Sequence, residues 1–297
     1  MSTPSPVRPP VVVAVDGSDS ALAAVRWAAC EASAHNLPLR LVHACVPPPI
    51  RFPTEPRVQA DYLDALSDHG RHSLREAEAL AGRTRLGLDI QQDLRVGEAV
   101  EVLLDAARGA KLLVTGSRGL GGFRSVLLGS VSAGVTAHAP CPVVVVRGDT
   151  PAEDSPVVVG VDGSPTSEAA VALAFEEASL HRVPLVAVHT WSDVAYEGLW
   201  TAVPMIVDFE ALAADERRVL DERMAGWQEK YPDVAVTKVV ERDRPVRALL
   251  AHAARARLLV VGSRSHHPFA GMGLGSTSQA LVHHGNCPVV VVPAETE

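Results

Sequence analysis

The chain alternates between short apolar runs and longer segments in which apolar residues recur every three or four positions. Val11–Val15 is a continuous, mostly β-branched run that ends at Asp-Gly-Ser, which is typical of a strand buried on both faces. In the segment that follows, apolar residues recur at helical spacing, and Ser18 or Ser20 precedes them as the N-cap. The chain therefore begins with a strand followed by a helix.

The alternation continues through the first half of the chain. Strands that alternate with helices require right-handed crossovers and give a parallel sheet. In such sheets, ligands bind beyond the carboxyl ends of the strands, at the point where the strand order reverses. The loops after the first and fourth strands are therefore the places to search for a site. The further strands expected are Pro38–Val46, Leu88–Leu94, Lys111–Thr115 and Val143–Val146, and the further helices are Gln59–Ala81, Gly97–Arg108 and Ser130–His138.

The second half of the chain repeats the first at a constant offset of 146 residues. VVVAVDGS, which begins at Val11, returns as VVVGVDGS at Val157. CPVVVV, which begins at Cys141, returns unchanged at Cys287. A repeat of this length is a whole domain, because the periods of solenoid proteins are much shorter.

The repeat predicts the domain organisation. We expect an α/β protein made of two tandem repeats of a doubly wound, parallel, five-stranded sheet. The first domain is expected at residues 1–148 and the second at 155–297. The seam, residues 147–156, is polar and contains proline, as a linker should.

Composition excludes several classes of function. The net charge of −8 argues against general binding to a nucleic-acid backbone, and 4% aromatic residues leave few stacking platforms. No apolar run approaches ~18 residues, and the N-terminal segment lacks the apolar core of a signal peptide. The four cysteines are far apart and form no CxxC pair, which indicates a reducing compartment. We therefore expect a cytoplasmic protein with no membrane or nucleic-acid partner.

The segment after the fourth expected strand is rich in glycine. Gly116 and Gly119 are followed, after nine residues, by Gly129-Ser130, which opens a helix. Glycines let backbone N–H groups approach an anion, and a helix N-terminus adds unpaired N–H groups and a favourable dipole. Arg118 and Arg124 could neutralise negative charge nearby. The alternative is that this segment is only a connector.

Asp16 stands at the carboxyl end of the first strand, and Asp162 stands at the matching place in the second half. A carboxylate there can accept from a ribose hydroxyl or an adenine amine, or hold a cation that bridges phosphates. The alternative is that both residues are plain helix caps. His43 and His189 lie within apolar runs, and we interpret them as core or sheet-edge histidines. No catalytic residue and no metal site is predicted.

These residues resemble the universal stress protein family in its tandem, ATP-binding form. The family pattern is Gly, two residues, Gly, nine residues, then Gly and Ser or Thr, which the glycine-rich segment matches in full. The resemblance covers both halves and implies an adenine nucleotide α-hydrolase-like fold. It implies ATP, with Mg²⁺ as a candidate companion, between the ends of the first and fourth strands. The binding residues carried over are Asp16, Gly17, Ala44, Gly116, Arg118, Gly119, Arg124, Gly129, Ser130 and Val131 in the first half, and Asp162, Gly163, Thr190, Gly262, Arg264, Gly275, Ser276 and Thr277 in the second.

The second half departs from the family pattern at one position. Gly262 and Gly275-Ser276 fit, but Ser265 stands where the pattern has glycine. If the backbone at Ser265 takes a positive φ, a residue with a side chain is strained there. We therefore expect weaker nucleotide binding in the second domain.

Three functions fit the resemblance. The first is a nucleotide-dependent regulator of a stress response. The alternatives are a slow ATPase or autophosphorylating enzyme, and an interaction module that binds no nucleotide. Phosphoryl transfer needs a catalytic base, a cationic clamp and a well-held Mg²⁺, whereas the sequence offers one Asp, two Arg and loop amides. We therefore expect binding without turnover.

Each half ends in an uncharged apolar strand. If Val143–Val146 and Val289–Val292 lie at sheet edges, as the resemblance implies, each exposes unpaired backbone groups that can template another strand. We expect the two copies to pair within one chain, which then imitates a dimer of single domains. A homodimer of two chains is a secondary expectation.

Overall fold

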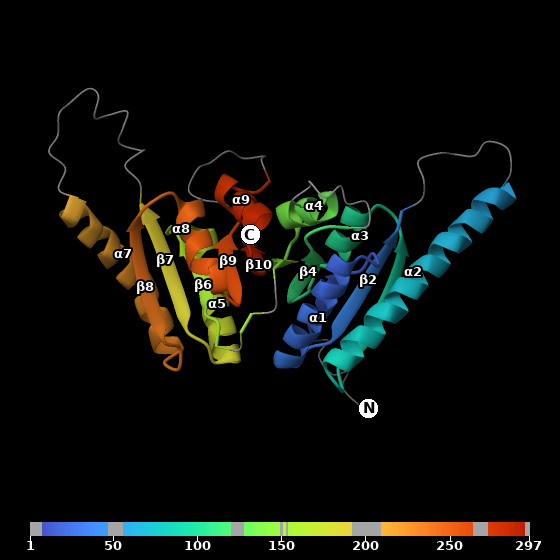
Figure 1. The fold of residues 1–297 in the computed structure, drawn as a ribbon, viewed down its shortest axis with the longest axis horizontal. Helices are drawn as coiled ribbons and strands as arrows, with labels where there is room; N and C mark the ends of the chain where they lie inside the picture. Colours follow the sequence, from blue (N-terminus) through green and yellow to red (C-terminus); the bar gives the residue numbers. More distant parts are fainter. Residues whose placement is uncertain are drawn as a thin grey trace, which may run out of the picture. The chain divides into compact units, whose positions relative to one another are not determined.

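A computed structural model of the 297-residue chain gives its fold. The structure describes residues 8–46, 56–119, 128–148, 151–152, 154–191, 209–263 and 273–294. The chain divides into two compact units, Met1–Arg147 and Gly148–Glu297. Each unit is an α/β domain in which strands and helices alternate (Figure 1).

The first unit holds a five-stranded parallel sheet with the order β3-β2-β1-β4-β5. The chain runs outward from β1 to β3 and then returns to the other side of β1, so the strand order reverses between β1 and β4. Val11, Val12 and Val13 of β1 are fully buried, as expected for the centre of such a sheet. The elements are β1 (Val11–Ala14), α1 (Asp19–Ala34), β2 (Leu39–Cys45), α2 (Pro56–Thr84), β3 (Ile90–Val96), α3 (Ala99–Ala106), β4 (Leu112–Gly116), α4 (Ser130–His138) and β5 (Val143–Val146).

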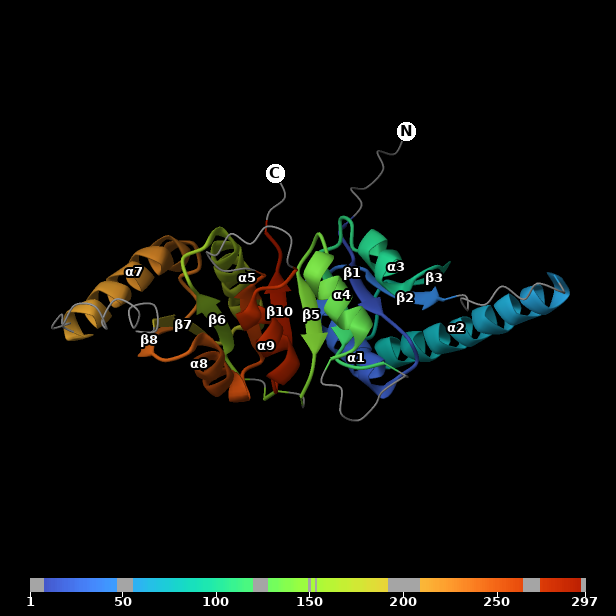
Figure 2. The same cartoon turned by 90° about the horizontal axis from the view of Figure 1, so that it is seen from above.

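The second unit repeats this architecture. Its parallel sheet has the order β8-β7-β6-β9-β10, with the reversal between β6 and β9. Figure 2 shows the strands of each unit side by side, with helices packed along them. The elements are β6 (Val157–Val161), α5 (Pro165–His181), β7 (Leu185–Trp191), α7 (Phe209–Lys230), β8 (Val236–Arg242), α8 (Pro245–His252), the 3₁₀ turn η1 (Ala253–Arg255), β9 (Leu258–Gly262), α9 (Ser276–His284) and β10 (Val289–Val292).

The expected elements are all present, but several limits were wrong. The third strand is Ile90–Val96 instead of Leu88–Leu94, because its pairing with β2 starts at Leu39 opposite Ile90 and runs to the end of both strands. The helix expected from Gly97 starts at Ala99, because Gly97 has a φ of 154°, which a helix excludes.

Other limits in the first unit differ by one to three residues. The strands expected at 38–46 and 111–115 are Leu39–Cys45 and Leu112–Gly116, and α3 ends at Ala106 instead of Arg108. The first strand ends at Ala14, one residue early. The long helix expected over 59–81 covers Pro56–Thr84, and a proline at its first position is compatible with helix because the N–H it lacks has no intrahelical acceptor there.

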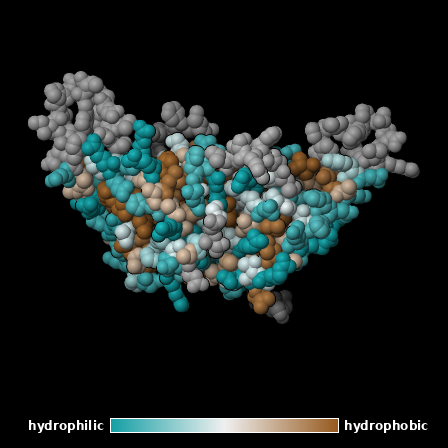
Figure 3. Space-filling model, viewed as in Figure 1, coloured by the Kyte–Doolittle hydropathy of each residue, from teal (hydrophilic) through white to brown (hydrophobic). Residues whose placement is uncertain are grey.

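Figure 3 shows hydrophilic residues over much of the visible surface of α2 and of α7.

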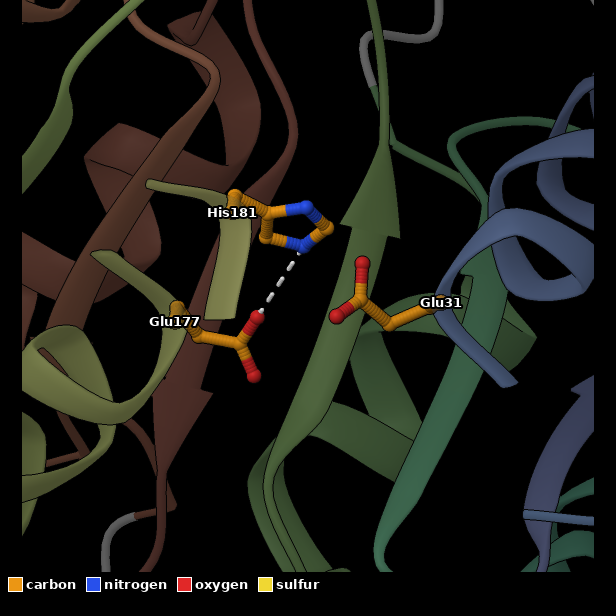
Figure 4. A group of neighbouring side chains, drawn as sticks. All are labelled: Glu31, Glu177 and His181. Carbon is orange, nitrogen blue, oxygen red and sulfur yellow. Dashed lines mark ion pairs between the residues drawn. The ribbon is translucent and has the colours of Figure 1, made fainter. Parts of the chain in front are cut away.

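The duplication extends to ion pairs inside the helices. Glu31 and His35 of α1 pair at 3.2 Å between Oε1 and Nε2, and Glu177 and His181 of α5 pair at 3.6 Å between Oε2 and Nε2. Figure 4 draws the α5 pair, whose side chains lie one turn apart on the same helix face. The 146-residue offset therefore holds for specific side-chain contacts as well as for secondary structure.

No helix in the described part of the chain is long and apolar enough to cross a membrane.

Candidate functional site

The turn after β1 fixes the carboxylate of Asp16. Its Oδ1 accepts hydrogen bonds from the backbone N–H of Ser18 at 2.9 Å and from the Ser18 hydroxyl at 2.7 Å. Gly17 between them has a φ of 85°, a conformation that glycine adopts at little cost. Ser18 is also the N-cap of α1, where its Oγ accepts from the N–H of Ala21 at 3.1 Å. Asp16 therefore braces the helix cap with one oxygen, while Oδ2 lies beside the loop that follows β4.

The loop after β4 approaches this turn closely. A Cβ on Gly116 would lie 2.5 Å from Oγ and 2.7 Å from the carbonyl carbon of Ser20, so no side chain fits there. The N–H of Arg118 donates to the Ser20 hydroxyl at 3.2 Å. A Cβ on Gly119 would lie 2.7 Å from Oδ2 of Asp16. The two loops predicted from the sequence are therefore in direct contact at the point where the strand order reverses.

Hydrogen bonds hold the start of α4 against the end of β4. Gly129 is the N-cap of α4 and donates its N–H to the carbonyl of Ser117 at 2.9 Å. The Ser132 hydroxyl donates to the carbonyl of Gly116 at 2.7 Å and lies 3.0 Å from the hydroxyl of Thr115. These contacts orient the first turn of α4 toward the space between the two loops.

A cavity of about 480 Å³ occupies that space, which is within the usual range of about 300–1,000 Å³ for small-molecule sites. Gly17 does not line it and instead forms the turn beneath Asp16. Arg124 lies outside the described residues. The predicted site residues that line the cavity are Asp16, Ala44, Gly116, Arg118, Gly119, Gly129, Ser130 and Val131.

Sequence reasoning missed the apolar wall of this cavity. Ala99 and Leu103, one turn apart on α3, contribute to it together with Val42 of β2. Their four-residue spacing marks one face of a helix. The sequence does not show which face turns toward the cavity, because that depends on how α3 crosses the sheet.

Positive charge gathers beside the glycine-rich loop. Arg118 lines the cavity. Burial, together with the nearby charge of Arg118, lowers the pKa of Arg147, the last residue of the first unit. Asp16 is the only carboxylate among the described residues that line the cavity. The described lining therefore combines one acidic group, one guanidinium, backbone amides and serine and threonine hydroxyls with apolar side chains.

His43 supports the strand end, in agreement with its interpretation as a sheet histidine. It is 8% exposed, and its Nδ1 lies 2.7 Å from the carbonyl of Val15, to which it donates. Burial lowers the pKa of His43 below its ordinary value of 6.5. The neutral ring therefore ties β2 to the residue before Asp16.

The second unit repeats the contacts at the strand ends. Oδ1 of Asp162 accepts from the N–H of Ser164 at 2.9 Å and from its hydroxyl at 2.6 Å, and Gly163 has a φ of 77°. The N–H of Gly275 donates to the carbonyl of Ser263 at 2.8 Å. Both aspartates therefore accept hydrogen bonds from the serine that caps the next helix, which agrees in part with the alternative interpretation of them as caps. Both also line a cavity.

The second cavity is smaller, at about 180 Å³. Gly163 and Ser276 do not line it, and Arg264 and Ser265 lie outside the described residues. The predicted site residues that do line it are Asp162, Thr190, Gly262, Gly275 and Thr277.

Comparison with known proteins places this architecture in one family. The model of the universal stress protein family matches residues 8–147 and again residues 155–293. A universal stress protein of Mycolicibacterium smegmatis is 42% identical over 289 residues, which cover 95% of this chain and 96% of that protein. One of Mycobacterium tuberculosis is 40% identical over 288 residues, which cover 95% of each.

Solved structures agree on the fold. A universal stress protein from Archaeoglobus fulgidus aligns with a TM-score of 0.71 and covers 96% of this chain and 98% of its own, at 21% sequence identity. The duplicated family match, the identity to full-length relatives and the shared fold lead to one conclusion. The chain belongs to the universal stress protein family and carries two family domains in tandem.

Proposed function

We propose that the first unit binds an adenine nucleotide, ATP, in the 480 Å³ cavity, and that the protein acts as a nucleotide-dependent regulator. The observation that carries the proposal is the close approach of Gly119 to the carboxylate of Asp16 in the lining of this cavity, which leaves no room for a side chain at position 119. It brings a glycine-rich segment and a carboxylate, which are 103 residues apart in the sequence, to one site.

Each part of the lining suits one part of the nucleotide. The apolar wall of Val42, Ala99 and Leu103 suits a purine base. Asp16 can accept from the ribose hydroxyls, and the first turn of α4 presents backbone N–H groups to the phosphates. Arg118 adds positive charge. Asp16 would be the carboxylate that holds a bound Mg²⁺, whose charge would offset that of the phosphates.

The lining favours binding over turnover. Phosphoryl transfer requires a positioned base and a cationic clamp besides the metal. In the described part of the cavity, Asp16 is the only candidate base, and one of its oxygens is committed to Ser18. Slow ATP hydrolysis or autophosphorylation remains the second candidate function.

The test is to extract the purified protein with acid, identify any nucleotide by chromatography, and then follow phosphate release from added ATP. ATP or ADP at close to one equivalent, without release above the buffer blank, supports a binding protein. Steady release that Asp16→Asn abolishes supports the enzyme, and an extract without nucleotide combined with no binding of added ATP contradicts both. The domain limits, the cytoplasmic location and the pairing of the two CPVVVV strands stay predictions from the sequence.

A further inference from the structure

The short helices α3 and α8 occupy equivalent places in the two units. Each is eight residues long, and α3 packs on β2 and α4 as α8 packs on β7 and α9 (Figure 1). Their inward faces are apolar, with Val102 and Leu103 buried in α3 and Ala248 and Leu249 buried in α8. Packing within each unit therefore accounts for the inward face of both helices.

The outward faces of these two helices carry opposite charge. Glu98 and Glu101 of the first unit stand where the second unit has Arg244 and Arg247, at the 146-residue offset. All four residues are exposed, so packing on their own sheet does not decide the sign of their charge. The duplication has therefore kept one face of the helix and reversed the charge of the other.

The two arginines do not stabilise the helix on which they lie. A helix N-terminus carries a positive partial charge, so acidic residues stabilise it and basic residues do the opposite. Glu101 lies in the first turn of α3, whereas the first turn of α8 has no acidic residue and Arg244 is its N-cap. Asp243 compensates in part, because it accepts from the N–H of Arg244 at 2.6 Å and from Nε of Arg247 at 2.7 Å. Helix stability therefore explains the acidic residues of α3 but not the arginines of α8.

Both charged faces continue past the first helical turn. Asp105 is exposed one turn beyond Glu101, although Nη1 of Arg95, at 2.7 Å, offsets its charge. Arg255 is exposed in η1, where the first unit has Gly109. The acidic face of α3 comprises Glu98, Glu101 and Asp105, and the basic face of α8 comprises Arg244, Arg247 and Arg255.

We propose that the acidic face of α3 in one chain docks on the basic face of α8 in a second copy of this chain. The spacing of the charges matches, because each face presents two of them three residues apart on helices of equal length. Every copy carries both faces, so two copies can make the contact twice. The net charge of −8 disfavours a long polyanion such as nucleic acid as the occupant of the basic face, whereas a second copy supplies the complementary charges on the equivalent helix.

The contact should be weak and sensitive to salt. Exposed ion pairs contribute little individually, and a helix of eight residues is only about 12 Å long. Sedimentation velocity of the full-length chain measures the association. The Debye length is about 20 Å at about 20 mM salt and about 4 Å at about 500 mM. We expect dimers at the low salt concentration and a dissociation constant at least tenfold larger at the high one.

Reversing the charge of each face tests which surfaces meet. Glu98→Arg with Glu101→Arg makes both faces basic, and Arg244→Glu with Arg247→Glu makes both acidic. Each variant alone should dimerise at least tenfold more weakly than the parent, because like charges then face each other. An equimolar mixture of the two variants should form heterodimers, and a chain with all four substitutions should dimerise as the parent does. Circular dichroism verifies folding, which exposed positions tolerate.

Matched controls separate these faces from the net charge of the chain. Glu76→Arg with Glu229→Arg changes the net charge by as much as the first variant, at exposed positions of α2 and α7. Arg75→Glu with Arg217→Glu does the same for the second variant. Both controls should dimerise within twofold of the parent.

Several outcomes would overturn the proposal. A parent chain that stays monomeric at low salt would do so, as would dimers that survive either pair of reversals or a mixture of the two variants that stays monomeric. A monomeric parent that binds a polyglutamate peptide through Arg244 and Arg247 would replace the second copy with a different acidic partner. The test does not depend on nucleotide binding, so its failure leaves the proposed function of the first unit untouched.

Discussion

Gly119→Ala tests the contact that brings the two loops together. The new Cβ would lie 2.7 Å from Oδ2 of Asp16, whereas ordinary van der Waals contact begins at 3.4 Å. Either the loop or the carboxylate must therefore move by about 0.7 Å. The carboxylate cannot move freely, because Ser18 holds its other oxygen by hydrogen bonds of 2.9 and 2.7 Å.

The cost to binding follows from the displaced carboxylate, which loses the hydrogen bond that it accepts from the nucleotide in the proposed complex. One hydrogen bond to a charged group contributes about 1.5–3 kcal/mol. Since about 1.4 kcal/mol corresponds to a tenfold change in affinity, ATP binding should weaken by roughly 10- to 150-fold. The glycine-rich pattern alone predicts that a side chain here hinders the approach of the backbone to an anion. The structure adds a conflict with Asp16, which exists before any ligand binds.

The assay is isothermal titration of the full-length protein with ATP and Mg²⁺. Gly82→Ala is the matched control, because a Cβ at this helical glycine of α2 meets nothing within 4 Å. The control should bind ATP as the parent does and be as stable or slightly more stable. A folded Gly119→Ala variant that binds ATP within twofold of the parent would refute the assigned site.

Three further predictions concern stability and reactivity. Gly70→Ala places a Cβ 2.7 Å from Cδ2 of His43, so urea denaturation should show a loss of about 1–3 kcal/mol, and an unchanged midpoint would contradict this packing. Burial lowers the pKa of His43, so as the pH falls the unfolded chain binds a proton at this residue before the folded chain does. The stability that the neutral, buried ring contributes is therefore present above pH 6.5 and is lost as the pH falls through that value. His43→Gln should therefore lose less stability than the parent between about pH 7.5 and about pH 5.5, and an equal or larger loss would show that His43 does not cause it. Burial raises the pKa of the Cys141 and Cys287 thiols to about 12, so iodoacetamide at about pH 8 should label both only after denaturation, and fast labelling of the native protein would show that they are accessible.

Most of the fold was predictable, because it depends on local patterns. Fully apolar runs such as Val11–Val15 show central strands, and the 146-residue repeat carries each prediction into the second half. The third strand was placed two residues early, because β3 lies at a sheet edge and its burial alternates weakly. Its limits follow from pairing with β2, which no local pattern records.

The polar part of the site was also predictable, whereas its walls were not. Asp16 and Gly119 are marked by strand ends and by glycine spacing, which are sequence features. Ala99 and Leu103 became lining residues only through the placement of α3. Arg147 follows the last strand of its unit and lies near Arg118, a proximity set by the order of β4 and β5 in the sheet.

Two equivalent histidines, one buried and one partly buried, show which features of the site the duplication has kept. His43 and His189 each donate from Nδ1 to the carbonyl of the residue before the aspartate, at 2.7 Å in both units. The other side of the ring differs: Gly70 packs against His43, while Glu216 at the equivalent position pairs with Nε2 of His189 at 2.9 Å. One ring is therefore enclosed by packing and the other is held by a carboxylate. Because the bond to the strand end survives this exchange, it is the feature that both units require to hold the aspartate turn. The hydrogen bond from the helix start to the strand end is kept as well, because Ser132 donates to the carbonyl of Gly116 and Ser278 donates to that of Gly262, at 2.7 and 2.6 Å. The units differ instead in single wall side chains, such as Ala44 in the first cavity and Thr190 in the second.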